Sequence, residues 1–591
     1  MKYFSALSRI PAILHFANAP FYIFLHILCT CLNHFRSAVL LVIFLNLFLQ
    51  MVNMQNSLVS VFTLLGIYIL LLSGIGTFSV WFENYYKPTI WPQVQEKFRN
   101  VLFQRSIASD LENFDQPDFY NEYIWAITQS DTVISGTITA LSELMDNLIT
   151  TICIICIFFR VDFRIAIPVF LCVAVTAILF SRIINENYCR ETEMAPLSRK
   201  TEYFKRVFYL KEYAKELRLT GIGKLLTQQF DEHEENVCRM NRIWGRRLCF
   251  WNTANGLAIS TFLDIGLRIL LTYQLMVSHT ISIGEYTAST FAIWSLFSGL
   301  NGLSSSLHSL SEYSMKADKI FRFLKERPQV YVNGRKEPPL RNQNRILCQN
   351  LSFRYHGNQD FTIENLSFEL HQGETLAIVG ENGSGKSTLI KLLLGLYMPQ
   401  SGEILINDNS LINYNITAYR KLFSVIFQDF SFFSASVAQN IMLDLQWDKT
   451  ELYDALEQSL YRKDPYLKRI PLDTCMTKEF SDDGIILSGG QAQKLVITRA
   501  FLKPPFVLMD EPSSELDVSS ERELNELILQ NSGRKGILII AHRLTTTRRA
   551  DRILVLSHGK KVEEGNHEEL MRQKGHYYRM FMAQAKQYQE N

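Results

Sequence analysis

The sequence has almost no net charge, because 60 lysines and arginines oppose 58 aspartates and glutamates in 591 residues. Proteins that bind nucleic acid usually carry an excess or a patch of positive charge, so we expect no nucleic-acid partner. Charged residues make up only 20% of the chain and hydrophobic residues 47%. This composition excludes an intrinsically disordered protein, and the length exceeds that of one ordinary domain.

The sequence also lacks the cysteine pattern of a disulfide framework. Its ten cysteines are scattered, and several lie within apolar runs. Cys153 and Cys156 form a CxxC motif, but no second pair follows at metal-ligand spacing. We interpret these cysteines as small hydrophobic packing residues.

Charged side chains are missing altogether between Ser37 and Phe82. A helix needs about 20 apolar residues to cross a bilayer, so this stretch can cross twice, with Asn53 to Asn56 as the turn. Four later apolar segments raise the number to six, which buried soluble helices do not explain. We predict membrane spans at 37–54, 57–82, 140–159, 165–181, 250–277 and 286–307, within a membrane domain of residues 37–318.

The two long connections between these spans are rich in lysine and arginine, for example Lys97 and Arg99 in one and Arg199 and Lys200 in the other. Positively charged loops stay in the cytoplasm. We therefore place both connections, both termini and the C-terminal domain on the cytoplasmic side. Their length and periodicity predict helical extensions of the membrane spans.

Residues 1–36 loosely resemble a secretory signal, but Arg9 and Pro11 interrupt the apolar region that such a signal requires. Phe21, Phe24 and Leu28 share one helical face. We therefore predict an interfacial segment that leads into the first crossing.

Beyond a linker at 319–344, short apolar runs alternate with helical patterns, which predicts an α/β domain with a largely parallel sheet over residues 345–591. The run 374–379 leads into a match to the phosphate-binding loop GxxxxGK[ST]. Backbone N–H groups, the helix N-terminus and a lysine bind phosphate in such loops. We predict phosphate contacts from Gly380, Glu381, Asn382, Gly383, Ser384, Gly385, Lys386, Ser387 and Thr388, with Ser387 also holding Mg²⁺.

A second apolar run, 506–509, delivers two adjacent acids, Asp510 and Glu511, to its end. A carboxylate at this position is suited to hold Mg²⁺, and the neighbouring one to orient or deprotonate a water that attacks the terminal phosphate. We predict Asp510 as the metal ligand and Glu511 as the catalytic base.

Between these sites lies Leu487-Ser-Gly-Gly-Gln491, and here the sequence resembles the ATP-binding cassette (ABC) transporters, which share this signature. Further elements of that family occur in order over residues 345–585. The resemblance implies adenine stacking by Tyr355, metal and catalytic contacts by Gln428, nucleotide contacts by Asp517 and a catalytic role for His542. Six membrane helices followed by one such domain resemble a half-size exporter. Glu515 and Ser481 depart from the usual family residues.

In that family, the signature of one domain closes over ATP held by the phosphate loop of another. The resemblance therefore assigns Ser488, Gly489, Gly490 and Gln491 to ATP bound by a second chain, and it implies a dimer. The partner is a second copy or a homologous half-transporter. The resemblance also implies contacts with the nucleotide domain from helices near 113–120 and 213–221.

Polar residues within the predicted spans are candidates for a substrate pathway. Ser298, Asn301, Ser305 and His308 recur at helical spacing, which favours a pore-lining face over ordinary packing. Asp264 lies one turn from Arg268, and Glu143 and Asp146 begin the third span. These charges either attract basic or zwitterionic cargo or serve structural pairing.

The fold class expected from these features is a membrane α-helical bundle of six helices with cytoplasmic extensions, followed by an α/β phosphate-loop nucleotide-binding domain. We expect an ATPase that uses ATP and Mg²⁺ to export a peptide or an amphipathic small molecule, in a bacterial inner membrane. The alternatives are a lipid or multidrug flippase, one half of a heterodimer, and a nucleotide-gated sensor or channel. A soluble phosphate-loop protein does not fit, because it would not carry six membrane spans.

Overall fold

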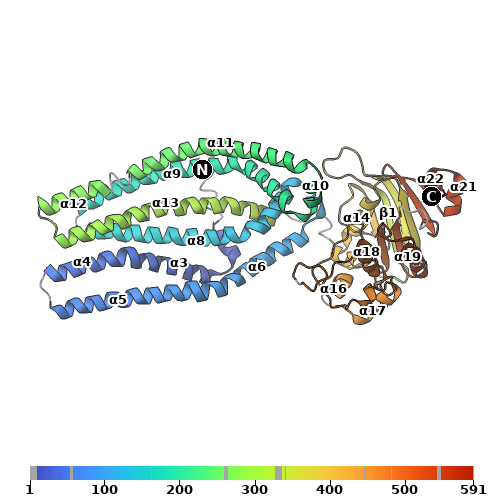
Figure 1. Ribbon diagram of the computed structural model, residues 1–591, viewed down its shortest axis with the longest axis horizontal. Coiled ribbons are helices and arrows are strands. Elements are labelled where there is room, and N and C mark those ends of the chain that lie inside the picture. Colours follow the sequence, from blue (N-terminus) through green and yellow to red (C-terminus); the bar gives the residue numbers. More distant parts are fainter. Residues whose placement is uncertain are drawn as a thin grey trace. The chain divides into compact units, whose positions relative to one another are not determined.

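In the computed structural model, the described residues are 10–53, 57–161, 163–258, 264–325, 334, 336–339, 341–444, 447–480, 482–541 and 547–589. The chain forms two compact units (Figure 1). The first contains residues 1–107 and 121–326, and the second contains residues 108–120 and 327–591. Residues 108–120 therefore belong to the second unit, although they connect helices of the first.

Long helices build the first unit, as the blue to green ribbon in Figure 1 shows. No glycine or proline follows Pro20 before Asn53, so α3 (Pro20–His34) continues through a π-helical turn, η1 (Phe35–Val39), into α4 (Leu40–Asn53). The predicted boundary at residue 36 thus falls inside a continuous helix. The other helices are α2 (Ile10–Ala17), α5 (Leu58–Trp81), η2 (Phe82–Tyr86), α6 (Lys87–Ala108), α8 (Pro117–Val161), α9 (Phe163–Tyr209), η3 (Lys211–Tyr213), α10 (Ala214–Leu219), α11 (Ile222–Leu257), α12 (Gly266–Met276) and α13 (Ile283–Lys325).

Within the described residues, three helical stretches are long and apolar enough to cross a membrane: Pro20–Met51, Leu58–Ala108 and Pro117–Phe159. Helix α5 buries none of its residues, as expected for a helix that is apolar on every side and faces lipid. The predicted spans 165–181 and 286–307 lie within α9 and α13. The predicted span 250–277 is divided between α11 and α12. Residues 259–263 of this span, and residues 54–56 of the predicted turn between the first two spans, lie outside the described residues. The total of six spans stays a prediction.

Small residues bring α8 and α13 into close contact. A Cβ atom added to Gly136 of α8 would lie 2.1 Å from the Tyr313 ring of α13, and one added to Gly302 would lie 2.1 Å from the Asn147 side chain. Helices in membranes often pack through such small residues, because the backbones can approach closely. An apolar core continues this contact, with Ile154 and Phe158 packed against buried residues of α13.

Two sheets build the second unit. An antiparallel sheet has the strand order β2 (Ile363–His371), β1 (Arg345–Phe353), β4 (Ser401–Ile406), β5 (Asn409–Ser410). The larger sheet has the order β10 (Lys560–Gly565), β9 (Arg552–Ser557), β3 (Thr375–Gly380), β8 (Gly536–Ile540), β7 (Phe506–Asp510), β6 (Phe423–Ile426), and only β10 is antiparallel to its neighbour.

Helices surround these sheets and supply the loops that carry the predicted site. Their bounds are α7 (Leu111–Phe114), α14 (Lys386–Leu393), η5 (Leu411–Asn413), α15 (Ile416–Arg420), α16 (Val437–Met442), α17 (Lys449–Gln458), η6 (Leu467–Arg469), α18 (Gly489–Ile497), η7 (Thr498–Phe501), α19 (Val518–Asn531), α21 (His567–Gln573) and α22 (His576–Gln589). One apolar cluster joins β1 and β2 to β3 and α14. The phosphate loop is therefore anchored in the core of this unit.

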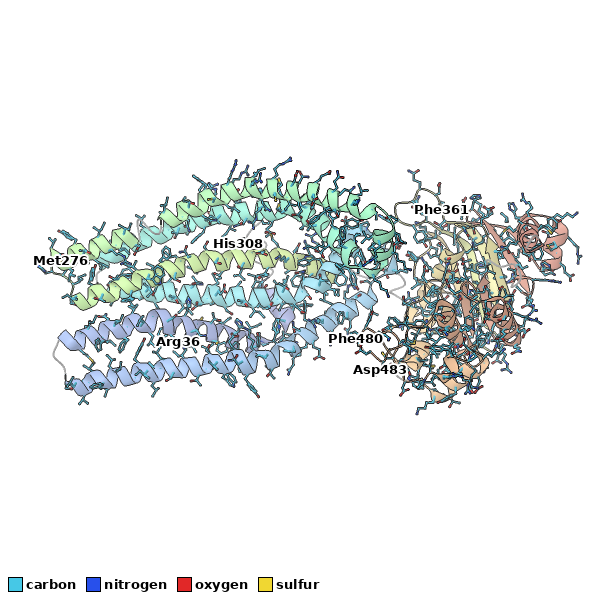
Figure 2. All side chains as sticks on the ribbon, viewed as in Figure 1. Arg36, Met276, His308, Phe361, Phe480 and Asp483 are labelled. Carbon is cyan, nitrogen blue, oxygen red and sulfur yellow. The ribbon has the colours of Figure 1, made fainter. Side chains whose placement is uncertain are left out.

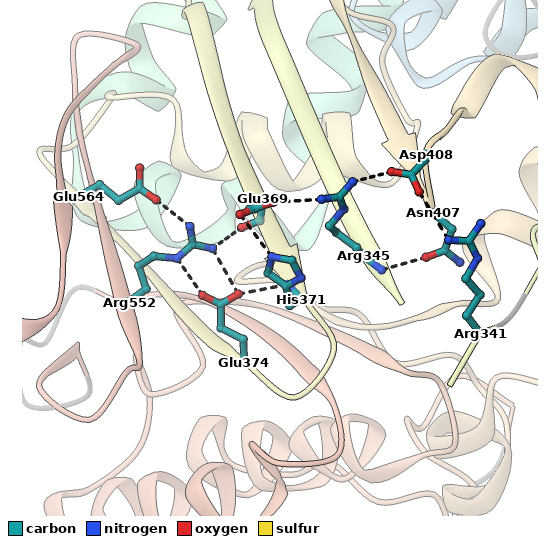
Figure 3. Close-up of polar contacts among 9 residues, drawn as sticks. All are labelled: Arg341, Arg345, Glu369, His371, Glu374, Asn407, Asp408, Arg552 and Glu564. Carbon is teal, nitrogen blue, oxygen red and sulfur yellow. Dashed lines mark hydrogen bonds and ion pairs between the residues drawn. The ribbon is translucent and has the colours of Figure 1, made fainter. Parts of the chain in front are cut away.

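A polar network also joins the two sheets (Figure 3). Arg552 of β9 donates hydrogen bonds to the carboxylates of Glu374 at 2.8 Å and Glu564 at 2.7 Å, and to the backbone carbonyl of Glu369 in β2. At the other end, Arg345 of β1 pairs with Asp408. The partly buried Arg552 pairs orient β9 and β2 relative to each other, because a planar guanidinium binds carboxylates in a fixed geometry.

Candidate nucleotide-binding site

The phosphate loop connects a fully buried strand to a buried helix. Strand β3 ends at Gly380, and α14 begins at Lys386. Gly385 has a left-handed backbone, with φ of 97°, and a Cβ atom there would lie 2.6 Å from the Thr362 carbonyl. Glycine is therefore required at this position. The backbone N–H groups at the start of the helix can then converge on an anion.

Lys386 is buried within this loop and is only 6% exposed. Its ammonium group donates hydrogen bonds of 2.9 Å to the carbonyls of Gly380 and Glu381. Burial lowers the pKa of Lys386, and the nearby carboxylates of Glu511 and Asp510 oppose that change. The positive charge thus lies between the loop and the two acids at the end of β7, where a phosphate group would need it.

Asp510 ends β7 and is 4% exposed. Burial raises its pKa, while a hydrogen bond from the Ser387 side chain lowers it. Among the described residues, its Oδ1 atom is buried and has no hydrogen-bond partner. An unused carboxylate oxygen beside a serine hydroxyl is the oxygen ligand set that Mg²⁺ prefers next to phosphates. The residues present therefore fit the predicted metal.

Glu511 follows the strand with a left-handed backbone, φ 49°. This conformation is uncommon for residues other than glycine and tends to occur at functional sites. Its Oε2 atom accepts a 3.1 Å hydrogen bond from Nε2 of Gln428. Because β6 and β7 are neighbouring parallel strands, these two predicted catalytic side chains meet just beyond the ends of their strands.

The phosphate loop, the two acids and Gln428 all follow the C-terminal ends of parallel strands. Ligands of open α/β sheets bind at this edge. His542 comes two residues after Ile540, the last residue of β8, which lies between β3 and β7. His542 itself lies outside the described residues, as does Ser481, so the predicted role of His542 stays a prediction.

Tyr355, the predicted adenine-stacking residue, lies against the start of α14. Its hydroxyl is 3.1 Å from Oγ1 of Thr388. Its ring packs edge-on against Phe353 and Tyr397 at centroid distances of 5.1 and 5.4 Å.

In the phosphate loop itself, the hydroxyl of Ser384 is buried without a hydrogen-bond partner among the described residues, and Asn382 and Gly383 lie beside it.

The signature begins α18 and is engaged in capping that helix. The Ser488 side chain accepts from the backbone N–H of Gln491, and the Gln491 side chain accepts from the N–H of Ser488. Ser488 and Gly489 are exposed, and Phe480, 85% exposed, lies in the loop before them (Figure 2). Within the described part of the chain, no hydrogen bond or ion pair joins the signature to the phosphate loop.

Asp517 also caps a helix rather than contacting the phosphate loop. Its carboxylate accepts hydrogen bonds from Ser520 N–H at 3.1 Å and the Ser519 hydroxyl at 2.8 Å. Hydrogen bonds from Ser520 and Ser519 lower the pKa of Asp517 to about 2. Within this chain, Asp517 is therefore the N-cap of α19.

One residue that sequence reasoning missed, Gln493, connects the signature helix to Glu511, the predicted catalytic base. It is 2% exposed. Its amide nitrogen donates to the carbonyl of Glu511 at 3.4 Å and to the Ser514 hydroxyl at 3.2 Å, and its oxygen accepts from the Glu515 N–H at 2.8 Å. A polar residue on the buried face of α18 is the signal that indicates such a role.

The predicted substrate-pathway charges are largely paired. Asp146 is 3% exposed and lies 2.9 Å from Nδ1 of His34. Asp264 lies 2.6 Å from the Arg268 guanidinium. Glu143 is exposed. Asp146 and Asp264 thus have structural partners, whereas the carboxylate of Glu143 projects from α8.

The predicted polar face of α13 is partly accessible in the single chain. Ser298 and Ser305 are exposed, and Asn301 and His308, the latter labelled in Figure 2, are half-buried. By contrast, Leu300 and Leu310 are buried. The polar stripe therefore faces away from the packed core, and its role in transport stays a prediction.

Comparisons with known proteins find a family match over the part of the chain that contains the phosphate loop. Residues 363–514 match the family model described as ABC transporter. The chain is 33% identical over 304 residues to the ATP-dependent lipid A-core flippase 2 of Colwellia psychrerythraea, covering 51% of each chain. It is 25% identical over 497 residues to the subtilin transport ATP-binding protein SpaT of Bacillus subtilis, covering 83% of this chain and 80% of that one.

The fold extends the likeness over nearly the whole chain. A solved structure of a bacterial Atm1-family ABC exporter with ATP bound matches with a TM-score of 0.77 at 20% identity, covering 96% of this chain and 97% of that one. At 33 to 35% identity, however, the chain spans only about half the length of the curated flippases that it matches.

These findings confirm the predicted fold class, a helical membrane bundle followed by an α/β nucleotide-binding domain. The candidate spans and the exporter fold make the chain a multi-pass membrane protein. In sequence, residues 363–514 of this chain match the ABC transporter family model, and in fold the chain is similar to a bacterial Atm1-family ABC exporter.

Proposed function

We propose that this protein is an ATPase that exports an amphipathic substrate across a bacterial inner membrane by alternating access. The observation that carries the proposal is the arrangement at the C-terminal edge of the sheet. There, the buried Lys386 and Asp510 lie beside the Gln428–Glu511 pair. This set supplies the phosphate contacts, the metal ligands and the water-orienting carboxylate that hydrolysis of a terminal phosphate requires.

Each residue has a separate task in this mechanism. The loop N–H groups and Lys386 bind the phosphates of ATP, and Tyr355 supports the adenine. Ser387, Asp510 and Gln428 would hold Mg²⁺, which supplies neutralisation of phosphate charge when bound. Glu511 orients the attacking water and accepts its proton, and the hydrogen bond from Gln428 fixes the position of its carboxylate. His542 is assigned to the terminal phosphate.

We also propose that two copies form the working unit, with ATP held between them. The exposed signature of each copy contacts the nucleotide of the other, because Ser488 and Gly489 approach no phosphate loop within the described part of their own chain. A symmetric dimer satisfies both sites at once. The rival assembly pairs this chain with a homologous half-transporter. In either assembly, both termini and the nucleotide-binding domains are cytoplasmic.

The cargo class follows from the membrane unit. Among the substrate-pathway candidates, Asp146 and Asp264 are already paired, so we propose that the polar face of α13 and the carboxylate of Glu143 provide the cargo contacts. A stripe of hydroxyl and amide groups beside buried leucines suits a molecule with polar and apolar parts. Relatives are named for a lipid A-core and for subtilin, which supports lipids and amphipathic peptides as the classes to test.

The decisive experiment reconstitutes the purified full chain in phospholipid vesicles. We expect ATP with Mg²⁺ to drive the movement of either a fluorescent phospholipid analogue or a labelled cationic amphipathic peptide, and the moving cargo to stimulate ATP hydrolysis. Hydrolysis without movement of any tested lipid, peptide or dye would argue for a nucleotide-gated sensor or channel. Activity that appears only after a homologous half-transporter is added would identify a heterodimer.

Glu515 provides a further test of the shared ATP site. A Cβ atom at the signature Gly489 would lie 2.9 Å from the Glu515 carboxylate. If the signature approaches the terminal phosphate of the partner's ATP, this negative charge opposes binding. We therefore expect Glu515→Gln to lower the KM for ATP about three- to tenfold, as measured by ATPase assays in vesicles.

A matched control for this prediction is Glu523→Gln, because Glu523 lies on α19 and pairs with Lys463 at 3.8 Å. That variant should leave the KM for ATP unchanged. An unchanged KM in Glu515→Gln would mean that the signature of this protein does not approach phosphate.

A further inference from the structure

The backbone that carries Tyr355, the predicted adenine-stacking residue, continues beyond the end of its strand. Strand β1 ends at Phe353. Its neighbour β4 begins at Ser401, which is paired with Ser352. On the other side of β1, the pairing with β2 also ends at Phe353. Within these described strands, neither neighbour therefore pairs with the backbone of Arg354, the residue directly before Tyr355.

The side chain of Gln400 pairs with Arg354 instead. Its Oε1 atom accepts a 3.1 Å hydrogen bond from the Arg354 N–H, and its Nε2 atom donates a 3.2 Å hydrogen bond to the Arg354 carbonyl. The Gln400 backbone N–H donates to the Ser352 carbonyl at 2.9 Å. A primary amide has the donor and the acceptor of a peptide group, so this side chain continues the β1–β4 ladder by one residue.

The side chain of Arg354 contacts the far end of the loop that follows. Its guanidinium donates to the Gln359 carbonyl at 3.5 Å and lies 5.6 Å from the ring of Phe361, which is labelled in Figure 2. Gln400 thus holds the backbone of the residue whose own side chain spans the loop. Because Tyr355 lies between these two contacts, its backbone is restrained from both sides.

The Tyr355 ring has contacts at its hydroxyl and along one edge. The hydroxyl lies 3.1 Å from Oγ1 of Thr388, the Tyr397 ring packs edge-on at 5.4 Å, and the Lys391 ammonium lies 5.8 Å from the ring centroid. Stacking on a base depends on the plane and the position of the ring. The direction in which the side chain leaves the chain is set by the backbone, so a rotation of the Arg354 peptide would tilt the ring away from a base.

We propose that Gln400 is a positioning residue for adenine. By holding the Arg354 backbone, it orients the Tyr355 ring before ATP binds, and a preorganised ring loses less conformational freedom on binding. Gln400 therefore determines how much the base adds to the affinity of the phosphate chain. The inference rests on the proposed contact of Tyr355 with adenine, and it adds a residue that lies in none of the sequence motifs.

The test measures the affinity of the purified full chain in phospholipid nanodiscs for ATP and for inorganic tripolyphosphate, which has no base. EDTA is present so that no ATP is hydrolysed, and calorimetric titration gives both dissociation constants. Gln400→Ala should weaken ATP binding about three- to tenfold, the range expected for two hydrogen bonds between neutral groups. Its affinity for tripolyphosphate should equal that of the parent, because the phosphate loop is untouched.

Tyr355→Ala completes a double-mutant cycle. If Gln400 acts through the Tyr355 ring, Gln400→Ala should cause no further loss of ATP affinity once Tyr355 is replaced. The control is Gln359→Ala: Gln359 is an exposed glutamine of the same loop whose bond with Arg354 uses only its backbone carbonyl. This variant should bind both ligands like the parent.

Three results would overturn the inference: an unchanged ATP affinity in Gln400→Ala, an equal loss for ATP and tripolyphosphate, or additive losses in the double variant. An equal loss would mean that Gln400 only stabilises the sheet. If Tyr355→Ala itself left the ATP affinity unchanged, the proposed adenine contact would fail, and the inference with it. A loss in Tyr355→Ala without one in Gln400→Ala would leave the proposed adenine contact intact and overturn only the role of Gln400.

Discussion

Replacing Glu511 with glutamine is expected to slow ATP turnover about 100-fold or more, the range that a positioned general base contributes, while ATP still binds. The amide keeps the shape of the Glu511 side chain and an oxygen that can accept the hydrogen bond from Gln428. In the parent protein, Nε2 of Gln428 lies 3.1 Å from Oε2 of Glu511. It cannot accept a proton from water. Steady-state ATPase rates in vesicles measure the loss, and binding of a fluorescent ATP analogue measures the affinity.

The matched control is Asp429→Asn, which removes an exposed carboxylate one residue from Gln428. It should hydrolyse ATP at close to the parental rate. If Glu511→Gln retained more than about a tenth of the parental turnover, another group would have to act as the base, and the left-handed backbone at Glu511 would need a different explanation.

The phosphate loop was predictable because its geometry is local. Glycines at fixed spacing, an apolar run before them and a helix-forming run after them specify strand, loop and helix within a short segment. The same applies to the two acids after β7. Their convergence with Gln428 required only that parallel strands end at one edge of a sheet.

Contacts between residues distant in the sequence were not predictable in this way. Nothing near Asp146 in the chain indicates that His34 is its partner, so the sequence leaves a structural pair and a cargo contact as open alternatives. Likewise, the motif around Ser488 identifies a signature in the sequence. The capping box that Ser488 forms with Gln491 can be recognised only when the start of α18 is known. The sequence predicts an N-terminal boundary at residue 36, where charge disappears, whereas the helix continues because the backbone meets no interrupting residue.

The hydrogen bond from the Tyr397 hydroxyl to Asp115 was not predictable for the same reason. The two residues are 282 positions apart, and each looks ordinary in the sequence. A buried tyrosine hydroxyl must find an acceptor, but the identity of that acceptor depends on how residues 108–120 join the second unit. Tertiary packing, rather than local propensity, therefore decides which acceptor the buried Tyr397 hydroxyl finds.

Pairing two inactive variants is expected to restore ATPase activity. Lys386→Met removes the phosphate-binding charge, and Ser488→Arg blocks the exposed signature, so each variant alone should retain little turnover. In a mixed dimer that shares its sites across the interface, one site carries both defects and the other carries neither. Mixed dimers isolated with two different affinity tags should therefore reach up to about half of the parental rate.

A site built within one chain predicts the opposite result. Each protomer of the mixed dimer would then keep its own defect, and no activity would return. The control is a mixed dimer in which both protomers carry Lys386→Met, which should stay inactive in either arrangement. Because Ser488 caps α18, Ser488→Asn, which keeps a capping oxygen, serves as a second signature variant. It should pair with Lys386→Met in the same way, and restoration by both variants separates a loss of contact across the interface from a local unfolding of the helix.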